Sequence, residues 1–250
     1  MLCVKTAYII SFWNDELRIK PPHPNPPLPG RGQKRKVKFG MTNKLAVFDF
    51  DSTLMDGETI EFFAREIGIE EKVKSITDKA MRGELDFFES LTKRVSFLKG
   101  LPVSKIDEIC HNLPLMNGAK EVVSGLKDKG YKVVCFSGGF KNATKLFVDK
   151  LSLDGEFSNI LHTKDEILTG QVGGEMMFNN SKGEMLLTLQ KLLGITRENT
   201  LVVGDGANDL SMFKYADYKV AFCAKPILKQ SANIIIEEKD LRRILDFVNT

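Results

Sequence analysis

Apolar runs of four to six residues recur along residues 41–250 and are separated by stretches with helical periodicity. Their length and their content of β-branched and aromatic residues are typical of buried strands. These runs cover residues 45–48, 131–136, 200–204, 219–222 and 233–236. The periodic stretches between and after them predict helices over residues 118–129, 140–151, 181–193 and 240–248. Strands that alternate with helices in this way favour a Rossmann-like α/β fold with a parallel sheet.

Two local patterns add detail to this part of the chain. Ser181, followed three residues later by Glu184, predicts the N-cap of the helix over residues 181–193. Short strand-like pieces near residues 160–162 and 171–172 are separated by Thr169 and Gly170, which predicts a hairpin.

Residues 57–111 interrupt the alternation, because they contain no strand signal. Apolar periodicity in this segment predicts four helices, over residues 58–69, 70–81, 86–99 and 104–111. Asp56 and Ser104 are candidate N-caps for the first and the last of them. A parallel sheet needs only one crossover helix here. We therefore expect a core of residues 41–56 and 112–250, with residues 57–111 as a small inserted helical cap.

Residues 1–40 differ from the rest of the chain. They hold eight basic and two acidic residues, giving a net charge of +6, whereas the remainder carries −3. The proline-rich run over residues 21–30 and the basic cluster over 31–38 favour an extended, disordered segment. A ligand for a proline-reading domain and a basic arm for nucleic acid remain alternatives. Met41 opens the folded region, so we expect it to be the natural start, which N-terminal sequencing would test.

Composition sets the broad class of the protein. A hydrophobic fraction of 42% with 28% charged residues is that of an ordinary globular protein. The acidic body lacks the basic face that nucleic-acid binding requires. The apolar run over residues 7–13 is too short to span a bilayer, so no membrane partner is expected. The four cysteines show no metal-ligand spacing, which favours reduced thiols and a cytoplasmic location.

Acidic residues follow two of the predicted strands. Asp49 and Asp51 end the first apolar run, and Asp205, Asn208 and Asp209 follow the run over 200–204. In open α/β sheets, ligands bind beyond the carboxyl ends of the strands. Oxygen ligands gathered there suit Mg²⁺. Capping of a following loop or helix is the alternative for the first pair.

Two further positions point to an anion. The strand over residues 131–136 ends in Ser137, Gly138 and Gly139, a turn whose amides can hold phosphate oxygens. Such turns are common, so this signal is weak alone. Lys182 lies in the first turn of a predicted helix, where the helix dipole disfavours a cation. A bound anion would reverse that penalty, and a solvated lysine is equally compatible with the pattern.

Arg94 breaks an apolar stripe in the predicted cap. It shares a helix face with Phe87, Leu91 and Leu98, and an arginine there is costly unless it pairs with a carboxylate or a ligand anion. Ligand binding, an internal salt bridge and snorkelling to the surface all remain open. Glu58 is weaker evidence, because glutamate is favoured in a first helical turn in any case.

Together these motifs resemble the haloacid dehalogenase superfamily of phosphohydrolases across residues 41–250. The signature comprises an Asp-Phe-Asp-Ser-Thr segment that ends at Thr53, then Ser137-Gly138-Gly139, Lys182, and a Gly-Asp-Gly-Ala-Asn-Asp segment that ends at Asp209. Within the superfamily, the chain is most similar to the phosphoserine phosphatase family. That closer resemblance rests on three segments: Asp51-Ser52-Thr53-Leu54 leading to Glu58-Thr59, Lys93-Arg94-Val95-Ser96 in the cap, and Phe136-Ser137-Gly138-Gly139-Phe140.

The resemblance implies Mg²⁺-dependent hydrolysis of O-phospho-L-serine, the last step of serine biosynthesis. Asp49 would attack phosphorus and become an aspartyl-phosphate. Asp51 would protonate the leaving hydroxyl and then deprotonate water. The metal would be held by Asp49, the Asp51 backbone carbonyl and Asp205.

The same resemblance implies the remaining site residues. Phosphoryl oxygens would be held by Ser137, the Gly138 amide and Lys182. The substrate's carboxylate and ammonium groups would be bound by Arg94 and Glu58. Asn208 would contribute to substrate binding as well as support the metal site, and Thr53 and Asp209 would be supporting residues. Three alternatives stay open: a phosphotransferase, a phosphatase for another small phosphate ester, and a phospho-acceptor signalling domain.

Overall fold

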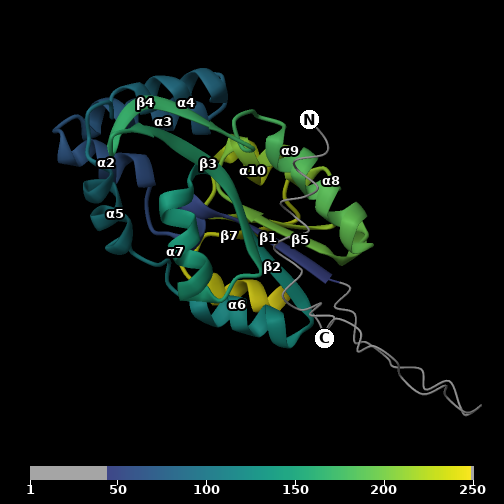
Figure 1. The fold of residues 1–250 in the computed structure, drawn as a ribbon. Coiled ribbons are helices and arrows are strands. Elements are labelled where there is room, and N and C mark those ends of the chain that lie inside the picture. Colours follow the sequence, from purple (N-terminus) through teal and green to yellow (C-terminus); the bar gives the residue numbers. More distant parts are fainter. Residues whose placement is uncertain (1–43, 249–250) are drawn as a thin grey trace, which may run out of the picture. The chain divides into compact units, whose positions relative to one another are not determined.

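The computed structural model describes residues 44–248, whose strands form one seven-stranded sheet (Figure 1). Across the sheet the strands are β4 (Ile167–Gly174), β3 (Gly155–Lys164), β2 (Tyr131–Phe140), β1 (Lys44–Asp49), β5 (Thr200–Gly204), β6 (Tyr218–Phe222) and β7 (Ile234–Ile236). Neighbouring strands run parallel, except in the antiparallel β3–β4 hairpin. The predicted α/β class is therefore confirmed. The predictions for residues 1–40, including a natural start at Met41, lie outside the described residues.

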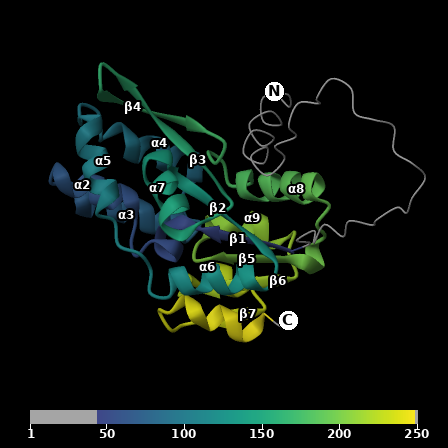
Figure 2. The same cartoon turned by 60° about the horizontal axis from the view of Figure 1, so that its bottom comes forward.

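Helices cover both faces of this sheet. They are α6 (Ala119–Asp128), α7 (Lys141–Leu151), α8 (Ser181–Leu193), α9 (Leu210–Phe213), α10 (Pro226–Lys229) and a 3₁₀ helix over Leu241–Phe247. Figure 2 shows α6 and α8 on opposite faces of the sheet. Strand β1 lies between β2 and β5, and its residues Leu45–Phe48 are fully buried. That burial on both faces explains why β1 reads as a continuous apolar run.

Four helices lie between β1 and β2 and form what we call the insertion. They are α2 (Thr59–Glu66), α3 (Glu70–Met81), α4 (Phe87–Ser96) and α5 (Val103–His111). The insertion packs beside the β3–β4 hairpin, because the Gly100 amide donates to the Leu168 carbonyl and the Val103 amide to the Glu166 carbonyl (Figure 1). No helix within residues 44–248 is long and apolar enough to cross a membrane.

Three predicted helix N-caps are wrong by one or two residues. Asp56 does not cap α2; the Asp51 carboxylate accepts hydrogen bonds from the Thr59 amide and hydroxyl instead. Helix α5 begins at Val103, before Ser104, and the residue that precedes it is Pro102. The predicted starts follow local capping preferences, which a distant carboxylate or a proline can replace.

Helix α8 shows the third case. Ser181 is its first helical residue, and Asn180 takes the N-cap position and donates to the Glu184 carboxylate at 2.5 Å.

The β3–β4 hairpin is confirmed, but its turn lies at Asp165 and Glu166, which have φ values of 50° and 59°. Gly170, which the sequence predicts at this turn, lies inside β4. An added Cβ there would come within 3.0 Å of the Lys99 side chain and 3.2 Å of the Ser96 carbonyl. Its φ of 79° also lies in the left-handed region, where the register between β3 and β4 shifts, so glycine is needed there both for the backbone conformation and for the close approach of the insertion.

Candidate active site

The carboxyl ends of β1 and β5 meet, because these parallel strands are neighbours in the sheet. Asp49 is the last residue of β1, and Asp205 directly follows β5. With Asp209, they offer three carboxylate oxygens within 4.8 Å of one another, and all three residues are buried. This is the gathering of acidic groups that the two strand-end motifs predict.

Lys182 reaches this cluster from the first turn of α8. Its Nζ lies 2.6 Å from Asp49 Oδ1 and 2.6 Å from Asp209 Oδ1, and the residue is only 3% exposed. Burial lowers the pKa of Lys182, but Asp209 and Asp49 more than offset it, so the pKa is raised. A solvated lysine is therefore excluded; this cation is paired inside the site.

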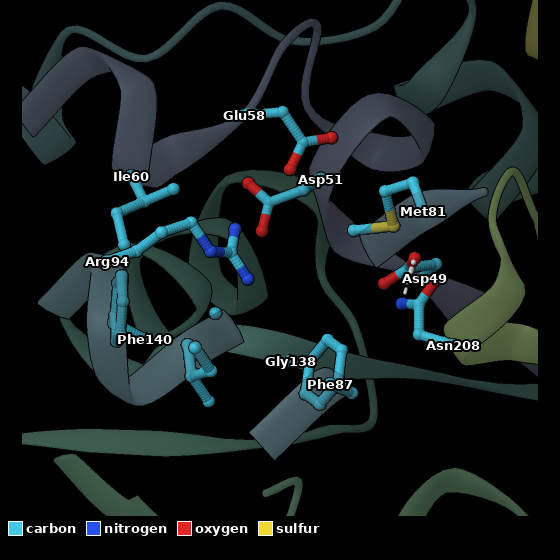
Figure 3. A pocket seen from close by; sticks show the side chains of 12 residues that line it. Asp49, Asp51, Glu58, Ile60, Met81, Phe87, Arg94, Gly138, Phe140 and Asn208 are labelled. Atoms are coloured by element: carbon cyan, nitrogen blue, oxygen red, sulfur yellow. Dashed lines mark hydrogen bonds between the residues drawn. The ribbon is translucent and has the colours of Figure 1, made fainter. Parts of the chain in front are cut away.

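The turn after β5 is built around the side chain of Asp209. Its Oδ2 accepts from the amides of Asp205, at 3.0 Å, and Gly206, at 3.2 Å. Any Cβ at Gly204 would lie 2.2 Å from that oxygen, so only glycine fits there. Asn208 donates to Asp49 Oδ2 at 3.3 Å, which connects the turn to the end of β1 (Figure 3).

The charge of the cluster fits a divalent cation. The cluster holds three carboxylates and one lysine, which pairs with Asp49 and Asp209. Asp205 Oδ1 and Asn208 Oδ1 are buried without a hydrogen-bond partner. Burial, then Asp49 and Asp209, raise the pKa of Asp205 well above its usual value, and burial raises that of Asp209 to about 7. Orphaned oxygen atoms in an excess of negative charge are ligands that a hard cation prefers. The residues thus fit a divalent metal.

Asp51 lies in the tight turn that follows β1. Its neighbour Ser52 has a φ of 57°, and the Asp51 Oδ1 atom accepts from Thr59 N at 2.7 Å and Thr59 Oγ1 at 2.5 Å. Burial raises the pKa of Asp51 to about 6, although the hydrogen bonds from Thr59 oppose the shift. A carboxyl group with a pKa near the working pH is suited to exchange protons. Thr53, two residues later, is fully buried, and its hydroxyl has no partner.

Ser137, Gly138 and Gly139 lie at the end of β2, beside Asp49. Asp49 pairs in register with Phe136, and the register between β2 and β3 shifts after that residue. The Ser137 hydroxyl accepts from the Gly139 amide at 2.8 Å. A Cβ on Gly139 would lie 2.8 Å from Asp51 Oδ2, so the glycine lets this loop approach the acid.

A cavity lies between these strand ends and the insertion (Figure 3). It is lined by Asp49, Asp51, Glu58, Ile60, Met81, Phe87, Leu91, Arg94, Gly138, Gly139, Phe140 and Asn208. The end of β1 supplies the Asp49 and Asp51 carboxylates, whereas the insertion supplies Glu58, Arg94 and most of the apolar wall. Sequence reasoning missed that wall, although Phe87 and Leu91 share the stripe that singled out Arg94.

Arg94 is buried and its guanidinium points into the cavity (Figure 3). Its Nη1 donates to Thr77 Oγ1 at 2.9 Å and its Nε to the Ser90 carbonyl at 3.2 Å. Burial lowers the pKa of Arg94. No ion pair among residues 44–248 includes it, and it is only 3% exposed. An internal salt bridge and snorkelling are therefore both unsupported, and binding of a ligand anion remains.

Glu58 lies opposite, on the far side of Asp51 in Figure 3. Its Oε1 accepts from the Ser52 hydroxyl at 2.8 Å. Burial raises the pKa of Glu58 well above its usual value, and Asp51 and Asp205 add to the shift. A carboxylate in such surroundings gains from a positively charged ligand group, which would favour its ionised form.

Comparisons with known proteins agree with this geometry. Residues 43–217 match the family model of the haloacid dehalogenase-like hydrolases. Phosphoserine phosphatase from Wolinella succinogenes is 64% identical over 202 residues, which are 81% of this chain and 98% of the relative. The Methanocaldococcus jannaschii phosphoserine phosphatase is 52% identical, over 82% of this chain and 97% of its own.

Solved structures give the same result. The structure described as a phospho-aspartyl intermediate analogue of phosphoserine phosphatase matches with a TM-score of 0.81 and 52% identity, over 83% of this chain and 99% of the other. A substrate-bound phosphoserine phosphatase complex matches with a TM-score of 0.81 and 51% identity, over the same shares. The chain therefore belongs to the phosphoserine phosphatase family of the haloacid dehalogenase-like hydrolases.

Proposed function

We propose that this enzyme hydrolyses O-phospho-L-serine to L-serine and phosphate with Mg²⁺ as its metal. The observation that carries the proposal is that Asp49, Asp51, Arg94 and Glu58 all line the same cavity. A small molecule with a phosphate at one end and an amino-acid group at the other matches that arrangement. We also propose that the enzyme acts in the cytoplasm and catalyses the last step of serine biosynthesis.

The insertion acts as the cap in this proposal, with residues 57–111 as cap and 41–56 with 112–250 as core. The Arg94 guanidinium, whose hydrogen-bond partners are the neutral Thr77 hydroxyl and Ser90 carbonyl, binds the substrate carboxylate through two parallel hydrogen bonds. Glu58 accepts from the substrate ammonium. The apolar side chains between them exclude water, which strengthens both interactions.

The core holds the phosphoryl group. Ser137 and the Gly138 amide donate to its oxygens, and Lys182 exchanges part of its contact with Asp49 for a phosphoryl oxygen. Asp49, the Asp51 backbone carbonyl and Asp205 would hold Mg²⁺, which would neutralise charge between the anionic nucleophile and the anionic phosphate. Asn208 orients Asp49, Asp209 orients Lys182, and Thr53 supports the turn that carries Asp51.

The chemistry proceeds in two steps. An Asp49 oxygen attacks phosphorus while Asp51, in its protonated form, donates its proton to the leaving serine oxygen. The phosphoryl group is then bonded to Asp49. Asp51, now ionised, takes a proton from water, which attacks the phosphorus and restores the Asp49 carboxylate. A carboxyl group whose pKa is raised to about 6 is suited to both roles.

Substrate comparison tests the proposal. The experiment compares kcat/KM for phosphoserine, phosphothreonine and a sugar phosphate in the wild type, in Arg94→Ala and in Arg65→Ala. Arg65 is the control, because it pairs with Glu70 at the exposed surface of the same insertion. We expect kcat/KM for phosphoserine to fall about 30-fold or more in Arg94→Ala, since truncating one partner of a buried charge pair costs about 2 kcal/mol or more. Equal loss for the sugar phosphate would show that Arg94 does not bind the carboxylate.

The covalent step has its own test. Asp49→Asn removes the nucleophile, so rapid acid quench with ³²P-labelled phosphoserine should trap phosphate on the wild type and none on the variant. Phosphate trapped on Asp49→Asn would refute the assignment. A phosphoenzyme that forms once and releases no phosphate would instead support a signalling domain.

A further inference from the structure

Asn159 is a fully buried residue of β3 whose side chain connects two separate segments of the core. Its Nδ2 donates to the carbonyl of Gly138 at 3.0 Å and to that of Met176 at 3.2 Å. Its Oδ1 accepts from the Met176 amide at 2.9 Å. Both amide hydrogens and the oxygen are thus used, which fixes the orientation of the carboxamide without ambiguity.

The contact with Gly138 follows from an irregularity in the sheet. Phe136 pairs with Phe157, but Phe140 pairs with Asn159, so the three residues 137–139 of β2 face one residue of β3. Such a bulge disrupts the ladder, and the backbone groups inside it need other partners. The Asn159 side chain provides one for the Gly138 carbonyl.

This contact reaches Ser137 through one rigid peptide group. The Gly138 carbonyl and the Gly139 amide belong to the same planar unit, so fixing one fixes the other. The Gly139 amide donates to the Ser137 hydroxyl at 2.8 Å. With one lone pair engaged in this way, the hydroxyl keeps its proton for another acceptor. Asn159 therefore biases the direction in which Ser137 can donate.

The other arm of Asn159 reaches the start of α8. Met176 lies six residues before Lys182, and the amide of Phe178, between them, donates to the Ser181 hydroxyl at 3.1 Å. The backbone at Gly174 packs closely against Asn159. A Cβ on Gly174 would lie 2.7 Å from Asn159 Cα and 2.7 Å from its Oδ1. One side chain thus holds together the two segments that carry Ser137 and Lys182.

We propose that Asn159 is a positioning residue for phosphoryl binding, which holds the Ser137 hydroxyl and the Gly138–Gly139 peptide in register with the start of α8. The proposal deepens the proposed function, because it rests on Ser137 as a phosphoryl ligand. It does not depend on the identity of the alcohol that carries the phosphate.

A purely structural role is the competing explanation, and Gln190 supplies the matched control. Gln190 is also a buried carboxamide that joins two segments, donating to Thr200 Oγ1 at 2.9 Å and to the Tyr215 carbonyl at 2.8 Å. Thr200 is the first residue of β5, whereas the site lies beyond the last. Gln190→Met and Asn159→Leu both replace a buried amide with an apolar side chain of similar size.

Binding of inorganic phosphate is the primary measurement, by calorimetry on the full chain with Mg²⁺. We expect Asn159→Leu to weaken it about tenfold, the order of effect seen when a residue that orients a ligand is removed. Gln190→Met should lower the melting temperature but leave phosphate affinity unchanged. Equal phosphate affinities in Asn159→Leu and Gln190→Met would overturn the proposal.

A double-mutant cycle with Ser137→Ala identifies the route of the effect. If Asn159 acts through Ser137, Asn159→Leu should weaken phosphate binding much less in the Ser137→Ala background than in the wild type. Losses that multiply would overturn the proposal. Asn159→Ala is made alongside because it adds no new atoms, and failure of both variants to fold would assign Asn159 a structural role only. Phosphate binding also separates this test from the proposed function, which fails if phosphoserine is not hydrolysed.

Discussion

The ammonium group of Lys182 lies 2.6 Å from the Asp49 carboxylate, so the candidate nucleophile is paired with a buried cation. The same Nζ lies 2.6 Å from Asp209, and all three residues are at most 3% exposed. Lys182 is therefore both a structural ion-pair partner and a candidate phosphoryl ligand. Its removal should affect the stability and the activity of the enzyme separately.

Lys182→Met is the variant that separates these two effects. It leaves two buried carboxylates without their cation, so the free energy of unfolding in EDTA should fall by about 3–5 kcal/mol. Mg²⁺ should restore part of that loss, while kcat stays reduced by about 100-fold or more. Urea unfolding and steady-state kinetics measure the two. Lys191→Met, at an exposed position on the same helix, should change neither quantity.

Asp205→Asn should have opposite effects on stability and on function. Burial, Asp49 and Asp209 raise the pKa of Asp205, which means that its ionised form destabilises the metal-free fold. The variant should therefore melt at a higher temperature than the wild type in EDTA. It should also gain less stability from added Mg²⁺ and lose activity. An unchanged Mg²⁺-induced shift in melting temperature would show that Asp205 is not a metal ligand.

The metal-free enzyme should lose stability as the pH rises. Burial raises the pKa of Asp51 to about 6 and that of Asp209 to about 7, from an ordinary value of 3.8. Between those values the folded state retains protons that the unfolded state has released, so the free energy of unfolding falls as pH increases. Urea unfolding in EDTA at several values between pH 4 and pH 7 measures the slope. Asp209→Asn should flatten it, and a slope equal to that of the wild type would show that Asp209 does not cause the pH dependence.

Much of the site could be predicted from the sequence because its residues lie at the ends of strands. Asp49 and Asp205 meet simply because β1 and β5 are parallel neighbours, and Lys182 is identified by an unfavourable position in its helix. The parts of the site that the sequence does not predict depend on contacts between distant segments. Asn159 acts on backbone groups of Gly138 and Met176, and no local pattern indicates such a contact.

Helix starts and turns are harder to predict from this sequence than strands. The cap of α2 comes from Asp51, eight residues before Thr59. Gly170 lies inside a strand, where it allows a positive φ and close packing, and does not form the hairpin turn. Local sequence rules describe what a residue prefers in isolation, and in these two places tertiary contacts override those preferences. Arg94 lies between the two cases, because its stripe predicts burial but does not predict its partner Thr77.

Thr77 provides the last prediction, since its hydroxyl holds the Arg94 guanidinium at 2.9 Å from another helix. The same hydroxyl donates to the Val73 carbonyl at 3.2 Å, so its lone pair faces the arginine. Thr77→Val keeps the shape of the side chain but removes the acceptor. We expect KM for phosphoserine to rise about tenfold with kcat little changed, because the carboxylate is bound equally in ground and transition states.

Thr77→Ser keeps the hydroxyl and should restore the KM, which a defect in packing would not allow. Phosphate release from a sugar phosphate, which has no carboxylate, should be equal in Thr77→Val and the wild type. A tenfold loss for that substrate as well would mean that Thr77 supports the insertion as a whole. If KM rises for phosphoserine alone and recovers in Thr77→Ser, the effect comes from the orientation of the Arg94 guanidinium.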